Sequence, residues 1–337
     1  MRALRLNSPN NFVIEDVEPG QLKPGWVRIH VKSVGVCGSD MSSMAGKLPF
    51  TKYPITPGHE FSGIVSEVKD CKNTAVGQYV TANPVFSCTK CPECLAGRIN
   101  HCSQTEVLGV VNYDGAYAQE LMLPEYMLEK IPEKISYEDA AMIEPIAVAV
   151  RAVQEAVVGD GSLVAIFGAG NIGLLVIQVA IAYGAAEVLV IEPNETRKSV
   201  ARELGADTVL TPDEFNEQKS LYINRFDAII DGVSIEKTLS YGIELGTKGG
   251  IIVVYGVPVS NSTPIALLDL FKKDMKIITS RLYSRSFKEA IRLLNEGKIN
   301  GKPMITHRVS LEDFPALISR IASGQEKSIK VIVNVER

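Results

Sequence analysis

The sequence contains little histidine and tryptophan, no excess of basic residues and no long apolar run. Four histidines and one tryptophan occur in 337 residues, so candidates for an imidazole ligand are few. The formal net charge of -4 argues against a nucleic-acid or anionic-membrane partner, because both attract basic surfaces. The most apolar segment, residues 172–182, is too short to span a bilayer, and residues 1–12 lack the apolar run of a signal peptide. We therefore expect a cytoplasmic protein.

Four of the six cysteines form one compact pattern, Cys-x2-Cys-x2-Cys-x7-Cys. They are Cys88, Cys91, Cys94 and Cys102. In a reducing compartment such a cluster indicates metal ligands rather than disulfides. Four thiolates complete a tetrahedral zinc shell and leave no position for substrate, so we expect a structural zinc and chemistry elsewhere. An iron–sulfur carrier is the alternative, but its usual continuation, a fourth cysteine after three residues and then proline, is absent.

The length of the chain predicts two domains, and the sequence texture changes along it. Short strand patterns broken by Gly and Pro fill the first third, for example residues 26–34, 61–68 and 78–81. From about residue 162, apolar strands alternate with helical runs, which is typical of a doubly wound parallel sheet. The strands are expected over residues 163–167, 187–191, 206–210, 226–231, 250–255 and 275–281.

The C-terminal part returns to short mixed elements. We expect helices over 286–296 and 311–323 with a loop between them, and a closing strand over 330–335. This tail is expected to rejoin the first domain. The predicted domains are therefore residues 1–146 with 282–337, and residues 147–281.

A glycine motif lies between the strand 163–167 and the helix expected over 172–183. Its residues are Gly168, Ala169, Gly170, Asn171, Ile172 and Gly173. In this context GxGxxG predicts a dinucleotide site, where the glycines and the helix N-terminus bind the pyrophosphate. Glu192 ends the next strand, where a carboxylate can accept both ribose hydroxyls and would repel a 2′-phosphate, so NAD is favoured. Arg197 is a candidate cofactor contact, although its spacing and that of Lys198 favour solvated surface charges.

A catalytic metal site needs three protein ligands and one exchangeable position, which a four-cysteine site does not offer. Its ligands are therefore expected outside the cysteine cluster. His59 and Glu60 follow a rigid Pro-Gly turn, and Cys37 supplies a thiolate on another loop, next to Ser39 and Asp40. The other histidines are expected to be structural or exposed. They are His30, His101 and His307.

Nearly end to end, the chain resembles the zinc-dependent medium-chain dehydrogenase/reductase family. The segments 37–40 and 58–60 are similar to its two catalytic-zinc motifs, and the four-cysteine pattern resembles its structural-zinc lobe. The resemblance implies an α/β protein with a GroES-like, β-rich catalytic domain and a Rossmann cofactor domain. It also implies two zinc ions per chain, one catalytic and one structural.

Within this family, residues 142–145 resemble the segment that carries a glutamate near zinc in sorbitol, threonine and galactitol-1-phosphate dehydrogenases. Cys37 and His59 are then ligands, and Glu60 and Glu144 are alternates that bind zinc directly or through water. Two carboxylates with one thiolate would leave the site net negative and weaken the Lewis acid. Exchange of the two glutamates, which would open a place for substrate, is our hypothesis.

The resemblance also assigns roles in proton and hydride transfer. Asp40 accepts a hydrogen bond from the far nitrogen of His59, and Ser39 accepts the alcohol proton while hydride passes to the nicotinamide. Many relatives continue this relay through a histidine where this chain has Ser42, so water or Ser42 must complete it. Arg281 matches a basic position near cofactor and substrate in polyol dehydrogenases.

Zinc-binding glutamates favour polyols, sugar acids or amino alcohols over ethanol, because a substrate with vicinal hydroxyls can chelate the metal. Residues 46–50 and 53–54 resemble hexonate dehydrogenases that act on L-galactonate or L-gulonate, and Lys47 and Lys52 could bind an acid or a phosphate. A galactitol-1-phosphate-like polyol-phosphate dehydrogenase and a threonine dehydrogenase are the alternatives. A non-catalytic NAD-binding protein is disfavoured because the catalytic ligands are present. By analogy with family strands that pair across a dimer, a homodimer or homotetramer is expected.

Overall fold

A computed structural model describes residues 1–258 and 260–335. The chain forms two compact units, Met1–Glu144 with Ile305–Arg337 and Pro145–Met304. Residues 282–304 therefore pack with the second unit, whereas the predicted boundary places them with the first. The physical reason lies in contacts within that unit: Tyr183 donates to Glu289 Oε1 (3.3 Å), and the backbone N–H of Asn300 donates to Gln178 Oε1 (2.6 Å). No helix among residues 1–258 and 260–335 is long and apolar enough to cross a membrane.

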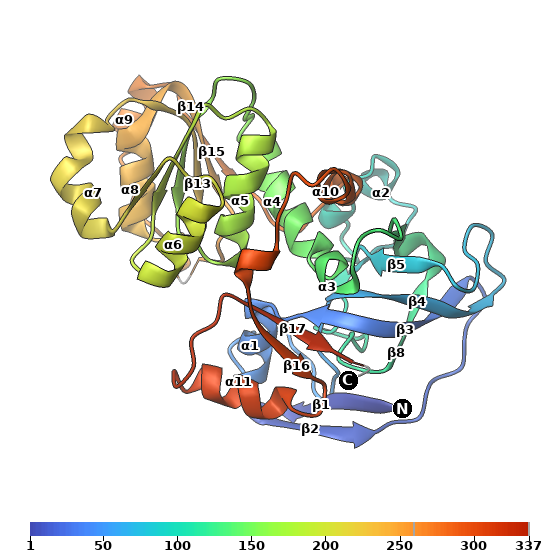
Figure 1. The fold of residues 1–337 in the computed structure, drawn as a ribbon. Helices are drawn as coiled ribbons and strands as arrows, with labels where there is room; N and C mark the ends of the chain where they lie inside the picture. The colour runs from blue at the N-terminus through green and yellow to red at the C-terminus, as the bar shows by residue number, and fades with distance from the viewer. Residues whose placement is uncertain (259, 336–337) are drawn as a thin grey trace. The chain divides into compact units, whose positions relative to one another are not determined.

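The first unit consists mainly of β-strands (Figure 1). Its strands are β1 (Arg2–Ser8), β2 (Asn11–Asp16), β3 (Trp26–Gly35), β4 (Glu60–Lys69), β5 (Tyr79–Ala82), β6 (Val85–Phe86), β7 (Glu106–Val107), β8 (Glu120–Pro124), β9 (Leu128–Lys130), β16 (Ile305–Ser310) and β17 (Lys330–Asn334). Its helices are α1 (Gly38–Met44), α2 (Pro92–Leu95), α3 (Tyr137–Ala140) and α11 (Phe314–Ala322), with the 3₁₀ turns η1 (Ile99–His101) and η2 (Glu125–Met127). Helix α4 (Ile143–Glu155) begins at the end of this unit.

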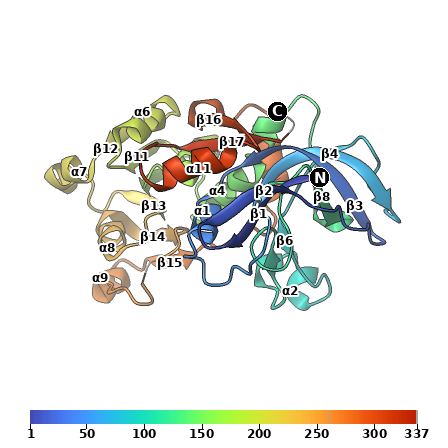
Figure 2. The same ribbon diagram turned by 90° about the horizontal axis from the view of Figure 1, so that it is seen from below.

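The main sheet of the first unit has the strand order β16-β17-β3-β4-β5-β9, and β8 also pairs with β3. Over its first seven residues β3 buries every second side chain, namely Val27, Ile29 and Val31, so this part places one face on the core. Strands β3 and β4 run side by side as long curved strands, and the short α2 lies in a lobe away from them (Figure 2). This lobe contains the cysteine cluster.

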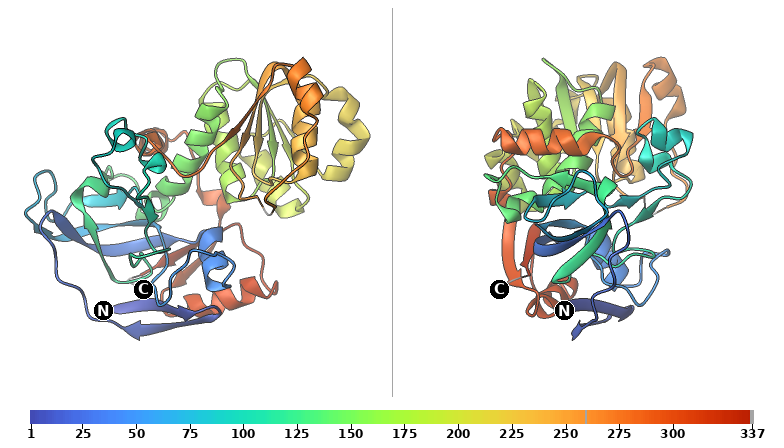
Figure 3. Two further views of the ribbon diagram at one scale, coloured as in Figure 1. Left: turned by 180° about the vertical axis from the view of Figure 1, so that it is seen from behind. Right: turned by 90° about the vertical axis from the view of Figure 1, so that its right-hand side faces the viewer.

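The C-terminal segment rejoins the first unit, as the sequence predicts. Strand β17 pairs antiparallel with β3, and the terminal helix and strands lie beside the N-terminal strands (Figure 3). The predicted loop before the last helix is wrong, because residues 305–310 form β16, which pairs parallel with β17. The helix α11 correspondingly begins at Phe314 instead of Leu311. In β16 the outward side chains of Thr306 and Arg308 are exposed, but the inward position between Ile305 and Val309 is the polar His307, so the sequence lacks a clear apolar alternation.

The second unit is a doubly wound sheet with the strand order β12-β11-β10-β13-β14-β15, and all its pairings are parallel. Its strands are β10 (Leu163–Phe167), β11 (Glu187–Ile191), β12 (Thr208–Leu210), β13 (Phe226–Asp231), β14 (Gly246–Val254) and β15 (Lys276–Thr279). Its helices are α5 (Asn171–Ala182), α6 (Glu195–Glu203), α7 (Pro212–Gln218), α8 (Glu236–Leu245), α9 (Leu267–Lys272) and α10 (Ser286–Asn295), with η3 (Lys219–Leu221) and η4 (Lys302–Met304). Helices α5 and α8 cover opposite faces of the sheet (Figure 1). Because the central strand β10 is buried on both faces, it reads as a continuous apolar run.

Candidate metal and cofactor sites

The four cysteines of the lobe converge on one point. Their sulfur atoms all lie within 4.8 Å of one another, and all four thiols are free of disulfides. Backbone N–H groups point at the sulfurs: that of Cys91 donates to Cys88 Sγ (3.3 Å) and that of Cys94 donates to Cys91 Sγ (3.5 Å). Such donors stabilise thiolates, which are the form that binds zinc. The residues therefore fit a tetrahedral zinc.

Two of these thiols, Cys88 and Cys91, have different pKa values. The backbone N–H groups of Lys90 and Cys91 lower the pKa of Cys88 to about 6. The N–H of Cys94 alone would lower the pKa of Cys91, but desolvation and the sulfurs of its neighbours together outweigh it and raise that pKa to about 11. One thiolate is thus present at neutral pH even before a metal binds.

A second group, Cys37, His59 and Glu60, also has its ligand atoms within 4.8 Å of one another. The register of the sheet brings it together. Gly35, which ends β3, pairs with Glu60, which begins β4, so the loop after β3 and the loop before β4 meet at one end of the strand pair. Cys37 and His59, distant in sequence, are placed on these two loops.

Asp40 supports this second group from the first turn of α1. Its Oδ2 accepts hydrogen bonds from the backbone N–H of Cys37 (3.0 Å) and from the hydroxyl of Tyr117 (2.9 Å). Its Oδ1 lies 3.4 Å from His59 Nδ1, a nitrogen that has no well-formed hydrogen bond among the described residues. Nδ1 therefore faces Asp40, and Nε2 is the nitrogen left for a metal.

The charges in this buried group act on one another. Burial alone would lower the pKa of His59, but the Asp40 carboxylate and the Cys37 sulfur outweigh it and raise that pKa well above its usual range. Burial alone would raise the pKa of Asp40, but His59 and the hydrogen bonds from Cys37 and Tyr117 hold that pKa below its usual value. The site therefore favours an anionic Asp40 and, when no metal is bound, a protonated imidazole on His59. The negative charge that favours this proton also favours a metal cation at the site.

Glu60 has a partner that the sequence did not indicate. Its Oε2 forms an ion pair with the Nζ of Lys330, and Lys330 also donates to the carbonyl of Val36 (3.2 Å). Both charged side chains are buried. Gly35 makes room for them, since a Cβ there would lie 2.4 Å from Glu60 Oε2 and 2.9 Å from Lys330 Nζ.

Three further predicted residues of the first unit are Ser39, Ser42 and Glu144. Ser39 is half-buried in the first turn of α1. Ser42 follows on the same helix, and its hydroxyl donates to the carbonyl of Gly38 (3.0 Å). Glu144 is buried in the first turn of α4 but lies outside the group of three whose ligand atoms are within 4.8 Å of one another.

The glycine loop of the second unit has the shape of a dinucleotide cradle. Gly168 adopts a φ of 90°, and a Cβ on Gly173 would lie 2.0 Å from the carbonyl oxygen of Gly168, so the loop needs glycine at both positions. Gly170 precedes α5, and a Cβ there would meet no atom within 4 Å. The Oδ1 of Asn171 is buried without a hydrogen-bond partner among the described residues. The open space at Gly170, directly before the N-terminus of α5, fits a pyrophosphate.

Glu192 is fixed next to this loop. Its two oxygens accept from the backbone N–H groups of Ala169 (2.7 Å) and Asn194 (2.9 Å). Arg197 is half-buried on α6. Lys198 is a correction to our expectation of a solvated charge: it is buried, and its Nζ binds Glu195 (3.1 Å) and a carboxylate of α7.

Arg281 lies beyond the end of β15, on an exposed position. Its backbone carbonyl accepts a hydrogen bond from the guanidinium of Arg151 on α4. The strand is shorter than the predicted 275–281, and Arg281 is held through its backbone while its side chain faces solvent.

Two residues that contact this second group or Asp40 beside it, Lys330 and Tyr117, were missed by sequence reasoning. Lys330 left one signal, a lysine at the start of an otherwise apolar strand. Tyr117 left none, because a tyrosine between alanines in a β-rich region is an ordinary core residue.

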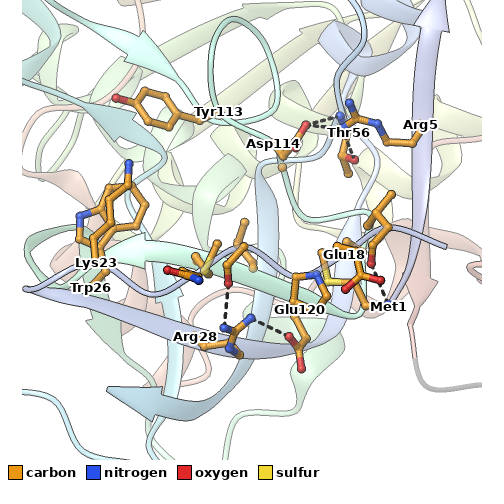
Figure 4. Close-up of a pocket in the computed structure, with 18 of the residues that line it drawn as sticks. Met1, Arg5, Glu18, Lys23, Trp26, Arg28, Thr56, Tyr113, Asp114 and Glu120 are labelled. Atoms are coloured by element: carbon orange, nitrogen blue, oxygen red, sulfur yellow. Dashed lines mark hydrogen bonds and ion pairs between the residues drawn. The ribbon is translucent and has the colours of Figure 1, made fainter. Parts of the chain in front are cut away.

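The first unit has a groove of about 700 Å³ (Figure 4), and no residue of either metal group lines it. Two arginines of the groove pair with carboxylates that also line it. Arg5 binds Asp114 (2.7 Å) and Arg28 binds Glu120 (2.9 Å). None of the predicted site residues lines the groove, and it carries no functional assignment.

The chain matches two family models. Residues 23–133 match the alcohol dehydrogenase GroES-like domain, and residues 171–296 match the zinc-binding dehydrogenase model. The D-xylulose reductase A of Aspergillus niger is 32% identical over 99% of this chain and 99% of its own length. The L-idonate 5-dehydrogenase of Vitis vinifera is 30% identical over 93% of this chain and 89% of its own length.

A solved structure is similar over the whole length. A zinc-binding dehydrogenase of Sinorhizobium meliloti 1021, with NADP bound, has a TM-score of 0.93 and 30% identity, and covers 99% of each chain. These similarities confirm the expected fold class, a GroES-like unit and a Rossmann unit.

Proposed function

Because the chain belongs to the zinc-dependent medium-chain dehydrogenase/reductase family, whose members are NAD(P)-dependent alcohol dehydrogenases, we propose that it transfers hydride between NAD and a secondary alcohol of a polyol or sugar acid. The observation that carries this proposal is the convergence of Cys37, His59 and Glu60 at one end of the β3–β4 pair. A thiolate, an imidazole and a carboxylate match the ligand types of a catalytic zinc.

In this proposal the two metal groups have different tasks. Cys88, Cys91, Cys94 and Cys102 hold a structural zinc, and Cys37 and His59 hold the catalytic one. When bound, a catalytic zinc lowers the pKa of a coordinated alcohol and fixes the oxygen in place. Asp40 holds the ring of His59 so that Nε2 faces the metal.

Ser39 is the proposed first acceptor of the alcohol proton. It is half-buried at the start of α1, two residues after Cys37, so it lies near the ligand group while keeping access to solvent. Ser42 is a weaker candidate for the next step, because its own proton is donated to the carbonyl of Gly38. We therefore assign the next position of the relay to water.

The exchange of Glu60 and Glu144 remains part of the proposal, and Lys330 supplies a physical reason for it. A carboxylate that leaves a cation inside a protein needs another positive partner, because an unpaired buried charge is strongly destabilising. Lys330 is such a partner for Glu60. Glu144 is buried at the start of α4, from which we propose that it takes over as the alternate ligand.

We propose NAD rather than NADP as the cofactor. Gly168, Gly170 and Gly173, with Asn171 and Ile172, form the pyrophosphate cradle at the start of α5. Glu192, already fixed by two backbone N–H groups, is the proposed acceptor for the ribose hydroxyls. A related structure holds NADP, so the carboxylate of Glu192 is the specific feature on which this choice depends. Arg197 and Arg281 are proposed as secondary cofactor contacts.

The proposed substrate is a polyol or a hexonate such as L-galactonate or L-gulonate. Two relatives are named for a sugar acid and a ketose, which supports a polyhydroxylated substrate. Lys47 and Lys52 are exposed between the two ligand loops, and Lys52 binds the side-chain oxygen of Asn112 (2.9 Å). Exposed cations between the ligand loops in the sequence also suit a phosphate, so a polyol phosphate is the second candidate, and threonine is included with it in the test.

The experiment is a substrate screen with zinc-loaded protein and either NAD or NADP. Polyols, hexonates, sugar phosphates and threonine are compared by the rate of NADH or NADPH formation. Reduction of NAD by a polyol or hexonate, with much lower rates for sugar phosphates and threonine, is the expected result. Turnover of none of the four classes, in protein shown to contain zinc, would reject the proposed function.

We also propose that the protein self-associates, as a homodimer or homotetramer, in the cytosol. Strand β15 is at an edge of its sheet, where unpaired backbone groups can pair with another strand. Helix α9 nearby in sequence leaves large apolar side chains exposed, including 81% of Phe271. Phe271→Glu should shift the mass measured by light scattering to the monomer, whereas Leu221→Glu, at another exposed apolar position, should leave it unchanged.

A further inference from the structure

We propose that Tyr117 is a positioning residue of the catalytic metal site: its hydroxyl fixes the carboxylate of Asp40, and Asp40 in turn orients His59. This inference rests on the proposed function, because that function makes His59 a zinc ligand. Tyr117 is completely buried, so neither substrate nor cofactor can touch it. Its influence must therefore pass through another side chain.

The hydrogen bonds show how this would work. The hydroxyl of Tyr117 lies 2.9 Å from Asp40 Oδ2 and 3.3 Å from the carbonyl oxygen of Gly35, so the single phenolic proton is best placed for Asp40. Oδ2 also accepts the backbone N–H of Cys37. With Oδ2 held by two donors, Oδ1 is the oxygen turned towards His59 Nδ1.

The rest of Tyr117 is tied to the loop that carries His59. Its backbone N–H donates to the carbonyl of Pro57 (3.1 Å), and a Cβ on Gly58 would lie 3.1 Å from the ring. On its other side the ring packs on Phe314, with 4.8 Å between the centroids. The backbone and ring thus brace one ligand loop, while the hydroxyl reaches Asp40 on the other.

The hydroxyl also has the protonation state that this role needs. Burial, together with the nearby carboxylates and the Cys37 sulfur, raises the pKa of Tyr117 well above its usual value, so the phenol remains a donor. A phenylalanine would keep the ring packing with Gly58 and Phe314 but would leave Oδ2 of Asp40 with one donor fewer. Because Asp40 is itself buried, that loss cannot be made good by bulk water.

The test is the rate at which a chelator removes zinc from Tyr117→Phe, followed with a zinc-sensitive dye. Two kinetic phases are expected, one for each zinc. The phase of the Cys37 and His59 site should become about tenfold faster, in line with the effect of losing a hydrogen bond behind a metal ligand. The phase of the four-cysteine site, which Tyr117 does not touch, should keep its rate and acts as the internal control.

Two further variants make the result specific. Tyr183→Phe is the matched control, since it removes a phenol that binds Gln154 (3.0 Å) and Glu289 (3.3 Å) in the second unit, and it should change neither phase. Asp40→Asn should also accelerate the first phase. If Tyr117 acts through Asp40, adding Tyr117→Phe to Asp40→Asn should produce little further acceleration.

Kinetics provide a second readout. In Tyr117→Phe the kcat should fall while the Kd for NADH is unchanged. Unchanged zinc release, or full additivity with Asp40→Asn, would overturn the inference, and so would a Tyr117→Phe chain that fails to fold while Asp40→Asn folds. Zinc release does not depend on any substrate. If no substrate in the screen is turned over but Tyr117→Phe releases zinc faster as expected, only the proposed function is rejected.

Discussion

Glu60 and Lys330 form an ion pair although 270 residues separate them in the sequence, and neither side chain is more than 1% exposed. Strand β17 brings Lys330 to the edge of the ligand group by pairing with β3. A buried pair contributes little net stability when complete, but removal of one partner leaves an uncompensated charge. Glu60 is therefore held between two possible cations, the amine of Lys330 and a metal.

Lys330→Met tests this relationship. In the zinc-free protein the unpaired Glu60 carboxylate should lower the free energy of unfolding by about 3–5 kcal/mol. With zinc bound the loss should be much smaller, because the metal can take the carboxylate. Differential scanning calorimetry of both forms measures the difference.

The double variant Lys330→Met with Glu60→Gln is the control for Lys330→Met. It removes both charges, so most of the stability of the zinc-free protein should return. An equal loss of stability with and without zinc would show that Glu60 does not reach the metal.

The Cys88 thiolate leads to a prediction about proton release. Zinc binds deprotonated thiols, so loading the cluster releases about four protons near pH 5 and at least about one fewer near pH 8. The difference arises because a pKa of about 6 leaves Cys88 ionised at the higher pH only. Calorimetric titration in buffers of different ionisation enthalpy counts the protons.

The titration is performed on zinc-depleted Cys37→Ser, in which only the four-cysteine cluster should bind tightly. Cys71→Ser in the same background removes a thiol outside the cluster and should leave both counts unchanged. Equal proton release at the two pH values would contradict the assigned ionisation of Cys88.

Gly170 provides a prediction for the cofactor cradle. Gly170→Ala should fold normally, because its Cβ meets no atom within 4 Å. The Kd for NADH should nevertheless rise about tenfold or more, because the methyl group stands where the backbone approaches the pyrophosphate. Gly159→Ala, whose Cβ also meets nothing, is the matched control and should bind NADH normally. Fluorescence titration of NADH gives both values. Normal NADH binding by Gly170→Ala would place the pyrophosphate elsewhere.

Glu192 decides the choice between NAD and NADP. Glu192→Ala should lower kcat/KM for NAD by about 10–100-fold, the effect of losing hydrogen bonds to a charged acceptor. The value for NADP should fall less or rise, because the repulsion of a 2′-phosphate is removed. Glu195→Ala, which removes a neighbouring carboxylate bound to Lys198, should not change the preference. A wild-type enzyme that prefers NADP would refute the assignment directly.

Much of the fold could be predicted from local patterns. Strand β10 and the glycine turn after it were predicted to the residue, because a strand buried on both faces and a loop that excludes side chains leave strong local signals. The loops that carry Cys37 and His59 also leave a local signal, since the side chains that could bind a metal or a proton lie within four consecutive residues in each loop.

The features that were missed depend on long-range packing. Strand β16 is recognised by its pairing with β17 rather than by alternation, and Lys330 becomes a site residue only when β17 reaches β3. Tyr117 reads as core until its hydroxyl is found on Asp40. Lys198 looked solvated on its helix, and only the position of Glu214 on another helix explains its burial.

The most direct test of the central claim is the zinc content and turnover of Cys37→Ser. The wild-type chain should contain about two zinc ions and reduce NAD with a polyol or hexonate, whereas Cys37→Ser should contain about one. This variant should bind NADH normally and lose turnover by several orders of magnitude. Turnover at the wild-type rate with a single zinc ion per chain would contradict the account.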